Sequence, residues 1–271
     1  MGKKENHKQD LIGLLDEFVD SGDPDKLLRY IALNSNLPGQ RANLELASAF
    51  SEAVEERAPR ETEQLWKLVL DMTGVSAAKA PVNSPEEFIP FCGAVGIGSI
   101  GSVAPRFLAQ ALAALRELAK DPRWRMREAV CMGLQRLLAG RRRDTLEELE
   151  RWVAGRSLLE MRAAAATVAS PVDLKQETMA LSALQLHRTI MDQVLRTKER
   201  KSEAFRILRK ALGYTLSVVV AAVPEDGFEY LCHLIDTQDP EVLWIVKQNL
   251  KKNRLLKNYP KAVESTKSLL E

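Results

Sequence analysis

The segment Asp121–Leu138, DPRWRMREAVCMGLQRLL, carries the features that decide the fold. Its Asp-Pro pair is typical of a turn, and the residues that follow predict a helix. A single basic residue, Arg127, stands early in that helix. Apolar residues then recur at helical spacing, at Met126, Val130, Leu134 and Leu137. This spacing places one apolar face against a neighbouring layer of helices.

Comparable stretches follow downstream, each with a basic residue early in the helix. These residues are Arg127, Arg162, Arg209 and Lys247, at intervals of 35, 47 and 38 positions. Two positions later stands a small residue, Ala129, Ala164 or Ala211, and in the last copy Asn249. Small residues let adjacent helices approach closely, and intervals of this size are typical of two-helix repeats. The sequence therefore predicts an all-α fold, an α-solenoid of stacked antiparallel helix pairs.

The first stretch resembles the second helix of a HEAT repeat, which often opens D-x-x-x-x-V-R-x-x-A-x-x-x-L. Asp121, Met126, Arg127 and Leu134 fit this pattern, whereas Ala129 comes one position early. The later copies fit less well, and only Asp239-Pro240 repeats the opening pair. The resemblance covers roughly the second half of the chain and implies a HEAT-like or ARM-like superhelix.

Two later segments resemble a particular HEAT-like branch, the DNA-alkylation-repair or AlkD-like proteins. They are RKALGYTLSVVVAA (209–222) and DPEVLWIVKQNLKKNRL (239–255). This resemblance implies a concave face lined with basic and aromatic residues and, in a glycosylase, an Asp flanked by tryptophans. No Asp of this chain matches that motif, because Asp121, Asp144 and Asp239 all lie at predicted helix starts, where capping explains them.

The charge of the chain is unevenly distributed. Residues 1–100 hold 10 Lys/Arg and 16 Asp/Glu, a net charge of −6, whereas residues 101–271 hold 29 and 21, a net charge of +8. Such asymmetry favours an anionic partner for the basic part, although solvated surface cations are the simpler interpretation. We expect a disordered tail over 1–9, an acidic helical cap or degenerate repeats over 10–82, and HEAT-like repeats over 83–271.

Four local features are also predicted from the sequence. Pro59 opens a new helix after the helix over 41–56, and residues 141–143 form a basic loop between helices. The run 213–223 has the composition of a strand but is expected to be a buried helix, because it continues a repeat. Residues 239–256 form the last repeat helix.

Several classes of site are disfavoured by what the sequence lacks. No apolar run reaches the ~18 residues of a membrane span, and residues 1–10 have no apolar core of a secretory signal. Cys92, Cys131 and Cys232 are widely spaced, which indicates reduced thiols in the cytoplasm. The three histidines form no ligand-spaced set with them. We therefore expect a cytoplasmic protein with no membrane, metal or cofactor site.

Residues Gly96–Gly101, GIGSIG, form a literal G-x-G-x-x-G, and Asp121 follows 20 positions after the last glycine. A dinucleotide site would need this motif between a strand and a helix. The surrounding sequence instead predicts helices. The favoured interpretation is a glycine-rich helix junction where two helices, or a helix and a partner's backbone, pack closely.

The basic residues of the repeats have two interpretations. They can pair with acids in adjacent turns, as in a buried ladder, which we favour for Arg127 and Arg162. They can instead lie on the concave face and contact phosphates, with Trp124, Trp152 or Trp244 stacking on bases. The candidate partner-binding residues are Trp124, Arg127, Arg162, Arg209, Lys210, Trp244, Lys247, Lys251, Lys252 and Arg254.

Three functions remain open on this sequence. The first is a non-catalytic scaffold that binds a protein through its concave face. The second is a solenoid that binds DNA or RNA through its basic repeats. The third, an AlkD-like glycosylase, ranks last because no catalytic residue can be assigned. His187, among apolar residues, is expected to be a packed or surface residue rather than a base.

Overall fold

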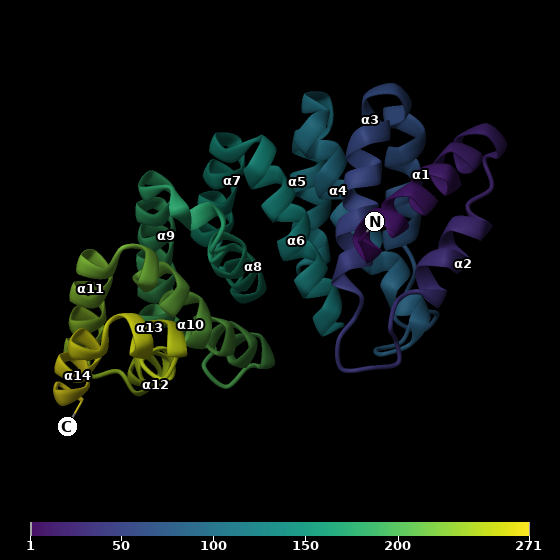
Figure 1. Cartoon of the computed structure of the whole chain (residues 1–271). Helices are drawn as coiled ribbons and strands as arrows, with labels where there is room; N and C mark the ends of the chain where they lie inside the picture. Colours follow the sequence, from purple (N-terminus) through teal and green to yellow (C-terminus); the bar gives the residue numbers. More distant parts are fainter. Residues whose placement is uncertain (1, 271) are drawn as a thin grey trace. The chain divides into compact units, whose positions relative to one another are not determined.

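The computed structural model describes residues 2–270, and every regular element in that range is a helix (Figure 1). The all-α prediction is therefore confirmed for the described chain. None of the helices in this range combines the length and the apolar character that a membrane crossing requires.

The chain divides into two compact units, residues 1–146 and 147–271, called unit 1 and unit 2 below. Unit 1 holds α1 (Lys3–Ser21), α2 (Asp25–Leu33), α3 (Leu44–Thr73), α4 (Phe88–Val103), α5 (Leu108–Leu118) and α6 (Trp124–Gly140). Helix α7 (Arg142–Ala154) crosses the division. Unit 2 continues with α8 (Leu158–Val168), α9 (Glu177–Arg196), α10 (Glu203–Ala222), α11 (Pro224–Asp236), α12 (Pro240–Asn249), α13 (Asn253–Asn258) and α14 (Pro260–Ser268). Short 3₁₀ turns at Pro85–Glu87, Pro105–Phe107 and Asp173–Lys175 lead into α4, α5 and α9.

Helix α4 forms the centre of unit 1 and packs mainly against α3 and α6. It contains the whole G-x-G-x-x-G segment, and all three of its glycines are buried. A Cβ atom on Gly98 would lie 2.1 Å from the carbonyl oxygen of Gly133 in α6. The glycines therefore allow close helix packing, as the favoured interpretation predicted, and the segment is not a loop that could cradle a pyrophosphate.

Helix α3 is longer than the sequence predicted, because the proline expected to separate two helices lies inside it. Pro59 is accommodated at a kink, where Glu61 has non-helical backbone angles of φ −121° and ψ 36°. The helix begins at Leu44, where the side chain of Asn43 accepts a hydrogen bond from the amide of Leu46 at 3.1 Å.

The start of the chain differs from the predicted disordered tail over residues 1–9. Helix α1 begins at Lys3, and Met1 lies outside the described residues. Polar contacts hold this first turn against later helices. Lys8 pairs with Glu56 at 3.0 Å, and Nδ1 of His7 lies 2.7 Å from the hydroxyl of Tyr30. Because these partners are more than 20 positions away, local composition alone could not reveal them.

Helix α10 forms the centre of unit 2 and packs mainly against α8 and α12. Asn249, which replaces the small residue in the last repeat copy, is fully buried at this contact. Its side chain donates to the carbonyls of Leu212 and Ile245, both at 2.8 Å, and accepts from the amide of Ser217 at 2.7 Å. A buried amide is satisfied here by three hydrogen bonds, so Asn249 joins α12 to α10.

Two local predictions in this part of the chain were wrong. The predicted helix over 239–256 is broken, because α12 ends at Asn249 and α13 begins at Asn253. The predicted basic loop at 141–143 is largely helical, since α7 begins at Arg142. Asp144 consequently lies in the first turn of α7 rather than at its N-cap.

The three cysteines form no disulfide. Cys92 and Cys131 are buried, and Cys232 is half-buried. Burial raises the pKa of the Cys92 thiol. No group of three or more His, Cys, Asp or Glu side chains within residues 2–270 is arranged to hold a metal ion.

Candidate functional site

The structure brings seven of the ten candidate residues together on neighbouring helices of unit 2. Helix α10 carries Arg209 and Lys210, α12 carries Trp244 and Lys247, and Lys251, Lys252 and Arg254 lie at the break into α13. Because α10 packs against both α12 and α13, these residues belong to one region. Of the other three, Arg162 lies half-buried on α8, while Trp124 and Arg127 lie on α6 in unit 1.

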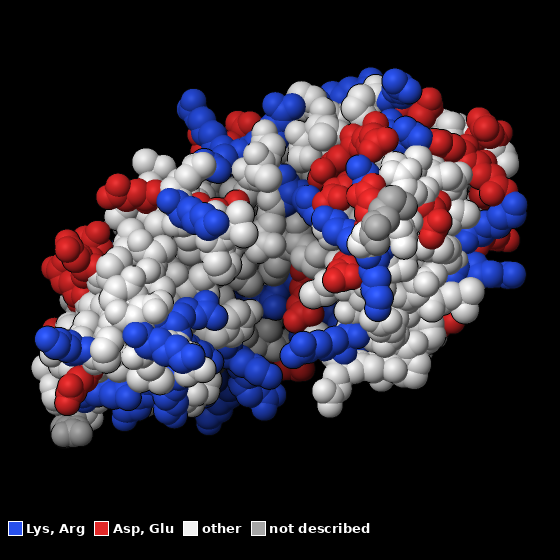
Figure 2. Space-filling view, in the orientation of Figure 1, with Lys and Arg blue, Asp and Glu red and all other residues white. Residues whose placement is uncertain are grey.

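Cations dominate this region, as the gathering of Lys and Arg over α12 and α13 in Figure 2 illustrates. Residues 242–263 contain six Lys/Arg and no Asp or Glu. We call the following set the basic surface: Arg206, Lys210, Lys247, Lys251, Lys252, Arg254, Lys257 and Lys261. All are exposed except Lys252, which is half-buried, and none forms an ion pair with another residue of the described chain. Such unneutralised cations are suited to bind an anionic partner.

Trp244 supports the basic surface and is not free to stack on a base. The guanidinium of Arg209 lies over its ring, 3.9 Å from the centroid, and also lies 2.8 Å from Oε2 of Glu241. Gly213 in α10 lies beside the ring, because a Cβ atom there would be 3.2 Å from it. Trp152 is fully buried, so it too is unavailable for stacking on a ligand. Neither tryptophan therefore offers an open ring to a base.

The arginines at the start of α6 make local and buried contacts. Arg127 donates to the carbonyl oxygens of Asp121 and Pro122, both at 2.9 Å, and so closes the turn that precedes its own helix. Two nearby arginines form buried ion pairs. Arg123 pairs with Asp121 at 2.7 Å, and Arg125 pairs with Glu87 at 3.1 Å. Only a contact map could have identified the second pair, because its two members are 38 positions apart.

Trp124 lies at a second feature, a hollow of about 810 Å³ in unit 1. The start of α1, the segment 33–45 and the start of α6 line it. We call this feature the unit 1 hollow. Trp124 is 40% exposed, and it is the one candidate residue that lines the hollow. The sequence did not predict this feature, because its walls come from three separate segments.

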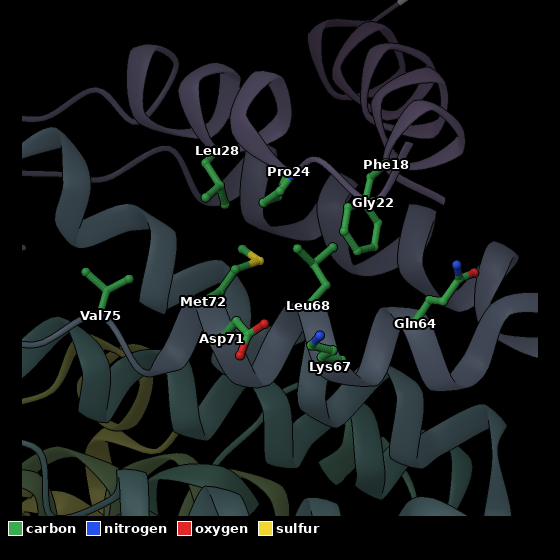
Figure 3. Close-up of a pocket in the computed structure, with 10 residues that line it drawn as sticks. All are labelled: Phe18, Gly22, Pro24, Leu28, Gln64, Lys67, Leu68, Asp71, Met72 and Val75. Atoms are coloured by element: carbon green, nitrogen blue, oxygen red, sulfur yellow. The ribbon is translucent and has the colours of Figure 1, made fainter. Parts of the chain in front are cut away.

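A smaller pocket of about 300 Å³ lies in unit 1 where the turn between α1 and α2 faces α3 (Figure 3). Phe18, Leu28, Leu68 and Met72 give it an apolar lining. Lys67, on the same stretch of α3, is its one basic lining residue. None of the candidate residues lies here.

The acidic residues considered for catalysis have structural roles in two of three cases. Asp121 accepts hydrogen bonds from the amide and the guanidinium of Arg123. Asp239 caps α12 and pairs with Arg200 at 2.6 Å. Burial would raise the pKa of Asp239, but Arg200 and the amides of Val242 and Glu241 together lower it. Both carboxylates are therefore engaged by their own turns.

His187 is fully buried and hydrogen-bonded within unit 2. Its Nε2 lies 3.0 Å from the hydroxyl of Thr215, and its Nδ1 lies 2.8 Å from the carbonyl of Ala183. Burial lowers the pKa of His187 to about 4. The ring is thus neutral at pH 7 and has no contact with solvent, in agreement with the predicted packing role.

No protein-family model matches the chain, and no curated protein matches it either. The resemblance to HEAT repeats and to their AlkD-like branch consequently stays a prediction from the residues quoted above.

Proposed function

We propose that this chain is a non-catalytic scaffold of HEAT-like repeats, located in the cytoplasm, that binds a macromolecular partner through a concave face. The packing of alternate helices supports this proposal. Helix α4 packs against α6 in unit 1, and α10 packs against both α8 and α12 in unit 2. Contacts between alternate helices are expected where helix pairs stack, and the four repeat markers lie on α6, α8, α10 and α12.

A second candidate, nucleic-acid binding by an AlkD-like solenoid, is favoured by the basic surface. Polyanion binding requires cations that are not already neutralised by acidic groups of the protein. Such a cation can neutralise a phosphate and thereby release the counterions condensed on the nucleic acid. The six Lys/Arg of residues 242–263 satisfy this requirement, since no acidic residue lies among them. With Trp152 buried and the ring of Trp244 covered by Arg209, the contacts would be made to the phosphate backbone.

The glycosylase alternative has less support. It needs a carboxylate that can reach a flipped nucleotide beside open tryptophan rings. Asp121 and Asp239 are held by arginines, and Trp152 is fully buried.

The two leading candidates are separated by fluorescence anisotropy with a short labelled DNA duplex across a salt series. Binding that weakens log-linearly with salt, and that Lys251/Lys252/Arg254→Ala reduces, would support the nucleic-acid candidate. Arg29/Arg60/Lys67→Ala is the matched control, because it removes three exposed cations from unit 1. If no duplex binds even at low salt, the nucleic-acid candidate and the glycosylase both fail.

A further inference from the structure

The unit 1 hollow gathers apolar side chains that face solvent. Leu33 is 78% exposed, Leu44 is 53% exposed and Trp124 is 40% exposed, and all three line this one hollow. The guanidinium of Arg125 lies 4.3 Å from the centroid of the Trp124 ring, and the indole keeps its 40% exposure beside this contact. Single exposed apolar residues are common on protein surfaces, whereas several that line one hollow can contact the same ligand. Tryptophan is also among the residues most enriched at the energetic centres of protein interfaces.

Arg125, one of the residues that line the hollow, forms a buried ion pair. Arg125 is 3% exposed and Glu87 is fully buried, and their side chains meet at 3.1 Å. The other terminal nitrogen of Arg125 donates to the carbonyl of Gly39 at 2.7 Å and to the side chain of Asn83 at 3.2 Å. Burying two charges costs solvation free energy, and here the pair positions the segment that carries Gly39. The pair and these two hydrogen bonds therefore hold residues 39 and 83 against the start of α6.

The segment 34–43 has a second set of internal bonds. The side chain of Asn43 donates to the carbonyl of Asn34, and the amide of Asn43 donates to the carbonyl of Ser35, both at 2.9 Å. By contrast, the side chains of Asn36 and Gln40 and the indole N–H of Trp124 have no hydrogen-bond partner among residues 2–270. An amide side chain offers a donor and an acceptor together, which is also the pattern of a peptide backbone.

The charges around the hollow are balanced, unlike those of the basic surface. Lys3 and Arg41 contribute two positive charges, and Glu45 and Glu128 contribute two negative charges. Arg125 is neutralised by Glu87. This balance disfavours a polyanion such as a nucleic acid and favours a segment with little net charge.

We propose that the unit 1 hollow binds an extended peptide segment of a partner protein. The segment packs apolar side chains against Leu33, Leu44 and Trp124, and its main chain hydrogen-bonds to Asn36 and Gln40. The volume of about 810 Å³ is within the range of sites that enclose a compact ligand. This inference rests on the scaffold proposal and names the class of partner that one face of the scaffold receives.

The test is selection of a random linear peptide library, displayed on phage, against the full chain. Enriched peptides are synthesised with a fluorophore, and their affinity is measured by anisotropy for the wild type and for two variants, Trp124→Ala and Leu44→Ala. We expect each variant to weaken binding by about tenfold or more, because both remove apolar contact area at the centre of the site. Trp124→Phe keeps an aromatic ring and should retain most of the affinity.

Leu70→Ala is the matched control, because Leu70 is an exposed leucine of unit 1 that does not line the hollow. It should leave the affinity within about twofold, as expected for a surface residue outside an interface. Circular dichroism of each variant checks the fold. Peptide binding should also change little between about 50 and 200 mM salt, whereas phosphate-backbone binding falls steeply over that range.

Two results would overturn the inference. If enriched peptides bind equally well to the wild type, Trp124→Ala and Leu44→Ala, the hollow is not their site, although the scaffold proposal survives at another surface. If the library yields no peptide above background, the hollow does not take peptides. The duplex titration tests the basic surface separately, because none of its residues lines the hollow.

Discussion

At the scale of single residues, His187 shows how a titratable side chain can serve packing alone. The ring is fully buried, and both of its nitrogens have partners within hydrogen-bond distance. Because Nδ1 faces a carbonyl oxygen, it must carry the proton, and Nε2 then accepts from the hydroxyl of Thr215. Burial disfavours the charged imidazolium more than the carbonyl of Ala183 stabilises it, so protonation of His187 opposes folding.

The pH dependence of stability follows from the direction of this shift. The pKa of His187 falls from 6.5 in the unfolded chain to about 4 in the fold. Between these values the unfolded state binds more protons, so the stability contribution present above pH 6.5 is lost as the pH falls toward 4. We expect this loss to reach up to about 3 kcal/mol.

His187→Gln should be less stable at pH 7 but should lose less stability between pH 7 and pH 4.5. Urea unfolding at both pH values gives the change in the free energy of unfolding with pH for the variant and for the wild type. Subtracting one change from the other cancels the contribution of the other titrating groups. Equal losses for the two proteins would show that His187 does not couple protonation to folding.

Residue roles could be predicted from sequence only where the partner is local. The buried packing of His187 was expected from its apolar neighbours, and the role of Asp239 in helix capping was expected from the Pro that follows it. The ion pair of Arg125 with Glu87 could not be predicted, since nothing near Arg125 in the sequence identifies its partner.

At the scale of helices, the contact between α4 and α6 depends on the absence of side chains at two positions. Gly98 and Gly133 bring the two backbones together, so an added methyl group at Gly98 has no space to occupy. Gly13 offers a matched comparison, because it lies within a helix, α1, and a Cβ atom there would meet no atom within 4 Å.

Gly98→Ala and Gly13→Ala should therefore change the stability in opposite directions. Gly13→Ala should stabilise the protein by about 0.5–1 kcal/mol, because alanine loses less backbone entropy in a helix. Gly98→Ala should destabilise it by about 1–3 kcal/mol or more, because the helices must separate. Chemical denaturation of both variants provides the test, and a stabilising Gly98→Ala would contradict the close contact.

Helices with a regular apolar pattern could be predicted from sequence, whereas their interruptions could not. The apolar run 213–223 has the composition of a strand, yet its continuity with the preceding pattern correctly predicted the helix α10. Pro59 predicted a helix end, but the kink at Glu61 accommodates it within α3. Whether a proline ends or bends a helix depends on the packing around it, which local sequence does not contain.

At the scale of the whole molecule, the charge asymmetry along the sequence leads to a quantitative expectation. If the basic surface binds duplex DNA, the logarithm of the affinity falls linearly with the logarithm of the salt concentration, with a slope set by the number of phosphate contacts. Lys251/Lys252/Arg254→Ala should reduce the magnitude of this slope by up to about 3, and the unit 1 control Arg29/Arg60/Lys67→Ala should leave it unchanged. Equal slopes for the two triple variants would contradict specific use of the basic surface.

The two candidate sites differ in how far the sequence could predict them. Five of the eight residues of the basic surface were predicted, because six of its cations are concentrated in one stretch, 242–263, and any fold of that stretch keeps them near one another. Arg206, Lys257 and Lys261 were not among the predicted residues. The unit 1 hollow was missed except for Trp124, since Leu33, Leu44 and Trp124 belong to segments that only tertiary structure brings together.

Because the cysteines differ in burial, their rates of chemical labelling report how often parts of the structure open. Cys92 lies fully buried in α4 with a raised pKa, whereas Cys232 in α11 is partly open to solvent. A thiol reagent reacts with the thiolate form of an accessible cysteine, so Cys232 can react in the folded protein. Cys92 can react only after α4 becomes exposed to solvent. The rate at which Cys92 is labelled therefore reports how often the core of unit 1 opens, and it does so without an introduced probe.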